Sequence, residues 1–262
     1  MIVFVEDLQV FVSLLFLFYA SWSDLKTREV SNWVWVVYAP IGAILSVILL
    51  YLFDFSYDML YVFGISVSVV SVLAVALFYA GAFGGADAKA LICLSLTLPF
   101  YPSNFLPLTS VTLLFPLSVF SNGIILAALS VLYALFRNAF WRQRTHRRLF
   151  ENLEHESKGR KVLALLSGYK IPMDKLEKSS FLYPLEDVEV LEEGETRRKL
   201  IVFPKDEERE EIVNRILAEA KQEKIEYVWA TPGLPMLVFI TAGLITALFL
   251  GDFVWLVLSH LL

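Results

Sequence analysis

The stretch WVWVVYAPIGAILSVILLYLF, from Trp33 to Phe53, contains no charged side chain. An α-helix needs about 20 mostly apolar residues to cross the hydrocarbon core of a bilayer, and this stretch is long enough. The whole chain of 262 residues shows the same tendency, since 57% of it is hydrophobic, whereas a soluble domain averages about 45–50%. We therefore expect a polytopic α-helical membrane protein.

Apolar segments on both sides of this stretch predict five further spans. They cover residues 5–22, 57–83, 88–98, 106–136 and 235–258, and the span 106–136 is expected to have a broken start near Pro116. The segment 88–98 is short because Pro99 follows it, and it crosses only about half a bilayer unless residues 100–106 extend it. Together with residues 33–53, these segments predict six transmembrane helices.

Positive charge is confined to three segments of the chain. Of the 22 Lys and Arg residues, only Lys26, Arg28 and Lys89 precede Arg137, and the other 19 lie between Arg137 and Lys224. If the N-terminus is outside, six spans place all three segments on the inner face, as the positive-inside rule requires. Without the short span 88–98 the Arg-rich segment would lie outside. We therefore expect a multi-pass cell-membrane protein with both termini outside.

The charged segment before the last span has the pattern of a small α+β domain. Residues 187–191 and 199–203 alternate or run apolar around a Glu-Glu-Gly-Glu turn, which predicts a β-hairpin. Residues 206–224 predict an amphipathic helix with Ile212 and Ile216 on its apolar face. The predicted organisation is a five-helix membrane domain, a cytoplasmic insert and a sixth transmembrane helix, at residues 1–140, 141–230 and 231–262.

Composition also limits the kinds of partner and cofactor that we expect. Residues 137–148 form a basic aromatic stretch that is typical of contacts with anionic lipid head groups. The net charge of −5 and the absence of a basic stripe do not suggest nucleic-acid binding. Cys93 is the only cysteine, and the histidines lack metal-ligand spacing. We therefore expect the lipid bilayer as a partner, and neither a metal nor another cofactor.

Two carboxylates stand out by position. Asp24 lies at the inner end of the first predicted span, and Asp87 lies at the inner end of the third. A carboxylate near hydrocarbon is a functional candidate because its burial is costly. Two adjacent carboxylates do not easily both ionise, and the shared proton supplies the acid and the base that aspartyl proteolysis requires.

The segment around each of these two aspartates also has a purely structural interpretation. Glycine permits a positive φ and the close approach of an extended peptide, which gives Gly81, Gly84 and Gly85 a possible role beside Asp87. The alternative is a small-residue interface between helices. Asp24 has the alternative of an interfacial acid paired with Lys26 or Arg28.

Both segments resemble one family. Gly84-Gly-Ala-Asp-Ala-Lys-Ala-Leu91 resembles the second aspartate motif of the type IV prepilin peptidases, in particular the archaeal branch with the preflagellin peptidases. The segment from Ser23 to Asn32 resembles their first motif, and Thr231-Pro-Gly-Leu-Pro235 is similar to the start of their last span. The resemblance implies an intramembrane aspartyl protease of the GxGD type.

Carried onto this sequence, the resemblance makes Asp24 and Asp87 the catalytic aspartates. The remaining motif positions, with an implied role in substrate binding, are Gly84, Gly85, Ala86, Lys89 and Asn32. Ala86 departs from the Gly-x-Gly-Asp pattern, which weakens the analogy to presenilin-like enzymes. The cysteine-rich domain of bifunctional bacterial members is absent, so we infer no N-methyltransferase activity. Lys89 could also bias the charge of Asp87, and Asn32 could cap the second helix.

The predicted function is cleavage of a short basic leader from a preflagellin or type IV pilin-like precursor at the cytoplasmic membrane face. One rival is an ion-coupled transporter whose two carboxylates bind a cation. It is disfavoured because both acids lie at one face and no inverted repeat is visible. A second rival is a non-catalytic component of a pilus or archaellum assembly machine, which predicts that replacing either aspartate is harmless.

Overall fold

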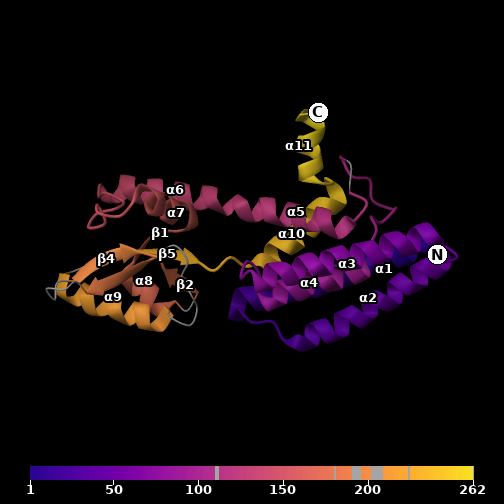
Figure 1. The fold of residues 1–262 in the computed structure, drawn as a ribbon, viewed down its shortest axis with the longest axis horizontal. Helices are drawn as coiled ribbons and strands as arrows, with labels where there is room; N and C mark the ends of the chain where they lie inside the picture. Colours follow the sequence, from indigo (N-terminus) through magenta and orange to yellow (C-terminus); the bar gives the residue numbers. More distant parts are fainter. Residues whose placement is uncertain (110–111, 180, 191–195, 202–208, 224, 262) are drawn as a thin grey trace. The chain divides into compact units, whose positions relative to one another are not determined.

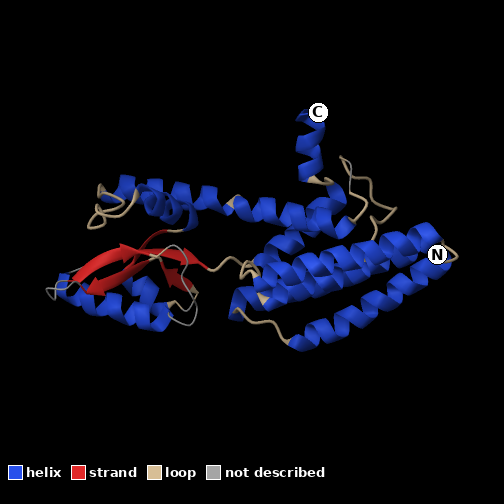
Figure 2. Ribbon diagram, in the orientation of Figure 1, coloured by secondary structure: helices blue, strands red, loops and turns tan. Residues whose placement is uncertain are grey.

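The computed structural model describes residues 1–262 except 110–111, 180, 191–195, 202–208, 224 and 262. The chain divides into two compact units. We call residues 1–127 with 235–262 the membrane unit, and residues 128–234 the insert unit. Figure 2 shows that the described strands all belong to the insert unit, whereas the membrane unit is helical.

Seven helices of the described residues contribute to the membrane unit, as Figure 1 labels them. They are α1 (Ile2–Thr27), α2 (Asn32–Leu52), α3 (Tyr57–Tyr79), α4 (Gly85–Thr97), α5 (Phe115–Ala128), α10 (Met236–Phe249) and α11 (Phe253–Leu261). Four helical segments of the described chain are long and apolar enough to cross a membrane: 2–27, 32–52, 57–79 and 115–145. Large apolar side chains such as Phe11 and Val72 are exposed on these helices, as expected where lipid is the solvent.

The structure corrects three of the expected span boundaries. The helix expected at 57–83 ends at Tyr79, and Gly81 follows with a φ of 72°. The helix expected at 106–136 begins at Phe115, close to the break expected near Pro116. The span expected at 235–258 is interrupted, because Gly251 has a φ of 88° and the Asp252 side chain accepts a hydrogen bond from the N–H of Val254 at 2.9 Å. An acceptor at that position starts a new helix.

The short helix α4 lies at the centre of the membrane unit. It packs against α1, α2, α3 and α10, and its Ala90, Leu91 and Leu94 are fully buried. Small residues permit this packing, since a Cβ atom on Gly42 of α2 would collide with Thr97 of α4. Four neighbouring helices therefore hold α4 in place, together with Asp87 in its first turn.

The insert unit combines helices with two small sheets. Its elements are α6 (Ser130–Thr145), α7 (Lys158–Ser167), β1 (Tyr169–Pro172), α8 (Met173–Lys178), β2 (Leu182–Pro184), β3 (Glu186–Val190), β4 (Thr196–Leu200), α9 (Arg209–Glu223) and β5 (Tyr227–Pro232). One antiparallel sheet has the order β1-β5-β2, and β3 pairs with β4. Trp229 on the central strand β5 is fully buried and stacks on Phe150, with ring centroids 4.9 Å apart.

The expected hairpin and amphipathic helix are both present. Strands β3 and β4 pair antiparallel with Val188 opposite Arg198, while the turn at 191–195 and the end of the second predicted strand lie outside the described residues. Helix α9 buries Ile212 and Ile216 as expected. The sheet β1-β5-β2 was not predicted, because its strands have only three to six residues and show no clear alternation.

Candidate active site

Asp24 lies in the last turn of α1 and is partly buried. The helix ends at Arg28, which has a left-handed φ of 59° and donates its backbone N–H to the Asp24 carbonyl at 3.0 Å. Ser23 and Thr27 then donate their hydroxyls to the carbonyl of Glu29, at 2.7 and 3.0 Å. These bonds fix the turn, so the backbone that carries Asp24 has a defined position.

Asp87 lies in the first turn of α4 and is also partly buried. Its Oδ2 accepts a hydrogen bond from the backbone N–H of Gly84 at 3.0 Å. This is the side-chain contact that an acid at the third helical position makes with the N-cap residue, and it orients the carboxylate. The structure therefore places Asp87 in α4, after the loop that follows α3.

The two glycines of the motif differ in what the structure requires. A Cβ atom on Gly84 would lie 3.2 Å from Oδ2 of Asp87, so a side chain there would crowd the carboxylate. A Cβ atom on Gly85 would meet a ring carbon of Phe78 at 3.6 Å, which is ordinary contact. Ala86 is partly buried against the membrane-unit core. Of these three positions, Gly84 has the most direct effect on Asp87.

The fold brings the two aspartates together from distant parts of the sequence. Helices α1 and α4 are in contact, and the carboxylates are close enough for the charge of Asp24 to act on Asp87. The charge of Arg28 acts on Asp24 in turn. Like charges within this range disfavour the simultaneous ionisation of both carboxylates.

Lys89 and Asn32 also come together, in a way that the sequence did not indicate. The Lys89 ammonium donates to Oδ1 of Asn32 at 2.6 Å and so joins α4 to the start of α2. The expectation that Asn32 caps α2 is wrong. Ser31 occupies the N-cap position, and Asn32 is the first helical residue. This bond links residues 57 positions apart, and no local pattern signals such a contact.

Comparisons with known proteins cover both units. Residues 11–136, which include both aspartates, match the model of the type IV leader peptidase family, and residues 160–253 match a model described as archaeal peptidase A24 C-terminus type II. The preflagellin peptidase of Methanococcus voltae is 30% identical over 247 residues, covering 92% of this chain and 94% of the relative. The preflagellin peptidase of Methanococcus maripaludis (strain C6 / ATCC BAA-1332) is 23% identical over 246 residues, covering 89% and 90%.

Proposed function

Because the chain belongs to the type IV leader peptidase family, we propose that it is an aspartyl endopeptidase that removes the leader from preflagellin-like precursors. Asp24 and Asp87 are its catalytic pair. The observation that carries this assignment is the convergence of these two partly buried carboxylates within electrostatic range. The names of the two relatives support a preflagellin as the substrate.

The chemistry follows from one proton shared by the pair. The ionised carboxylate takes a proton from a water molecule, and the resulting hydroxide attacks the carbonyl carbon of the scissile peptide bond. The protonated carboxylate donates its proton to the carbonyl oxygen of the tetrahedral intermediate. When the C–N bond breaks, the amine leaves with a proton from the pair. Gly84 is exposed beside Asp87, and an extended precursor can approach its backbone closely.

The position of the pair also suits this class of substrate. We place six helices in the membrane: the four long segments together with α4 and α10. The termini are then outside, and both aspartates and the part of the insert unit that follows α6 are at the cytoplasmic face, because this arrangement keeps every Lys and Arg inside. A short basic leader ahead of a hydrophobic helix presents its scissile bond at that face, where an ionised carboxylate also attracts the leader.

The direct test is a cleavage assay with the purified full-length chain in lipid vesicles and a preflagellin as the substrate. We expect mass spectrometry to show a product that lacks the leader and begins just before the hydrophobic helix. The preflagellin peptidase of Methanococcus voltae serves as the positive control. If that relative processes the precursor and this chain leaves several preflagellins and pilin precursors intact, the proposed function is wrong.

The bond between Lys89 and Asn32 predicts a smaller effect on the same assay. We expect Asn32→Ala to slow cleavage about fivefold at most, because a charge-assisted hydrogen bond between two exposed side chains contributes about 1 kcal/mol or less to holding α2 against α4. Asn32→Asp keeps an acceptor for Lys89 and is the matched control. Equal rates for the Ala variant and the wild type would show that this bond does not position the site.

A further inference from the structure

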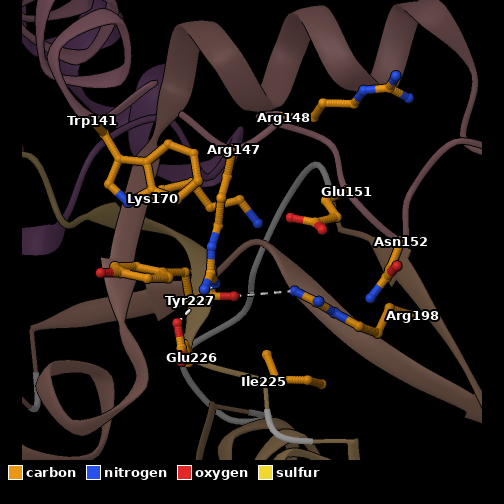
Figure 3. Close-up of a pocket in the computed structure, with 10 residues that line it drawn as sticks. All are labelled: Trp141, Arg147, Arg148, Glu151, Asn152, Lys170, Arg198, Ile225, Glu226 and Tyr227. Atoms are coloured by element: carbon orange, nitrogen blue, oxygen red, sulfur yellow. Dashed lines mark hydrogen bonds and ion pairs between the residues drawn. The ribbon is translucent and has the colours of Figure 1, made fainter. Parts of the chain in front are cut away.

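The insert unit contains a polar cavity of about 340 Å³ that the peptidase chemistry does not use (Figure 3). It lies between the chain that follows α6 and the strands β1, β4 and β5. Its lining residues are Trp141, Arg147, Arg148, Glu151, Asn152, Lys170, Arg198, Ile225, Glu226 and Tyr227. Four of these are cations and two are acids, so positive charge dominates the lining.

Two of the cations share one buried carboxylate. Lys170 Nζ lies 3.2 Å from Oε1 of Glu186, and Arg198 Nε donates to its Oε2 at 2.8 Å. The side chains of Lys170, Glu186 and Arg198 are only 4%, 1% and 8% exposed. Glu186 Oε1 also accepts the backbone N–H of Trp229 at 2.7 Å. The three side chains carry one net positive charge that is almost wholly removed from water.

An excess buried charge is costly unless a counter-ion lies nearby. Burial lowers the pKa of Lys170 below its ordinary value, and the carboxylate of Glu186 acts in the opposite direction. The exposed Glu151 also acts on Lys170, but an exposed acid is a weak counter-ion. The cavity therefore has the electrostatic character of a site for a further anion.

The rim adds two more cations, and one of them is already oriented. Arg147 is paired with Glu226 at 2.7 Å, and its guanidinium lies 5.8 Å from the ring centroid of Tyr227. Trp141 packs edge-on against the same ring, with centroids 5.3 Å apart. In Figure 3 Arg147 extends past Trp141 toward Glu226, with which it is paired. Holding a guanidinium in place reduces the entropy lost when it binds an anion.

From the cavity and its cations, we propose that the insert unit binds a phosphoryl group there, with Lys170 and Arg198 at the floor and Arg147 and Arg148 at the rim. Arginine matches the geometry of phosphate oxygens through paired N–H donors. With Glu151, Glu186 and Glu226 counted against the four cations, the site keeps a surplus of one positive charge. A phosphoryl anion compensates that surplus.

A phospholipid head group and free phosphate share this chemistry. Arg147 and Arg148 belong to the basic aromatic stretch 137–148 and directly follow the helical segment 115–145, which is long and apolar enough to cross a membrane. The cavity is lined by residues of the insert unit, whereas the two aspartates belong to the membrane unit. Failure of this proposal leaves the proposed peptidase function untouched, since the two have different readouts.

The first measurement is the thermal stability of the purified full-length chain in detergent, titrated with inorganic phosphate against chloride at equal ionic strength. We expect a saturable rise in the unfolding temperature. Arg148→Gln should raise the half-saturating phosphate concentration about fivefold, and Arg148→Lys should recover much of the loss. Glu151→Gln should lower that concentration, because it removes an opposing charge.

Lys178→Gln is the matched control, since Lys178 is an exposed cation of the same unit that does not line the cavity. A second arm reconstitutes the chain in phosphatidylcholine vesicles with or without phosphatidylglycerol. If the wild type retains phosphatidylglycerol, Arg148→Gln loses it and phosphate displaces it, the phosphoryl group in the cavity is that of a lipid head group. If phosphate stabilises the chain equally in vesicles with and without phosphatidylglycerol, the cavity binds a free anion. The proposal would be overturned if neither phosphate nor phosphatidylglycerol bound saturably. It would also be overturned if Lys178→Gln and Arg148→Gln weakened phosphate binding equally.

Discussion

Replacing either Asp24 or Asp87 by Asn is expected to reduce leader removal by about 10³-fold or more. Asparagine has nearly the shape of aspartate but neither accepts nor releases a proton at neutral pH, so each substitution removes one half of the acid–base pair. The two losses should not add, because the carboxylates act as a unit. The measurement is the initial rate of preflagellin cleavage by wild type, Asp24→Asn, Asp87→Asn and the double variant.

Asp58→Asn provides the matched control for this series. Asp58 is an exposed acid in the first turn of α3, and Asp87 follows the other end of that helix. The same isosteric change there should leave the rate within a factor of two. Amounts of each variant in the membrane must be equal, since a lost protein imitates a lost activity. Cleavage that survives in both Asp24→Asn and Asp87→Asn would exclude this pair as the catalytic aspartates.

Replacing Glu186 by Gln is expected to have the largest effect on stability. The substitution keeps the side-chain shape but leaves the ammonium of Lys170 and the guanidinium of Arg198 buried without their common counter-ion. Breaking a buried ion pair in this way costs about 3–5 kcal/mol. We expect the unfolding temperature of the insert unit to fall by about 10 °C.

Glu189→Gln is the control on the same strand. Glu189 lies within 3.5 Å of Arg197 and 3.9 Å of Lys199, but its side chain is 43% exposed. An exposed pair of this kind contributes about 0–1 kcal/mol. The comparison belongs in phosphate-free buffer, so that no anion from solution compensates the freed cations. Similar unfolding temperatures for Glu186→Gln and Glu189→Gln would show that the buried charges are not coupled as described.

Several features of the site were accessible from the sequence because they depend on local chemistry. The turn residues around Asp24 and the glycines before Asp87 mark helix boundaries next to an acid. The structure changes the details, since Asp24 lies inside α1 and Asp87 inside α4. The bond between Lys89 and Asn32 was missed, because it depends on the packing of α2 against α4.

The amino-acid sequence was enough to predict most of the apolar helical segments, the segments from which positive charge is excluded, and two acids at the ends of apolar segments. Hydropathy and charge are properties of each segment alone, and a bilayer selects for them directly. The packing of the chain is what brings Asp24 of α1 near Asp87 of α4, and what brings residues of β1, β4 and β5 to Glu186 of β3. These contacts join residues far apart in the chain, and their geometry depends on how the helices and strands pack.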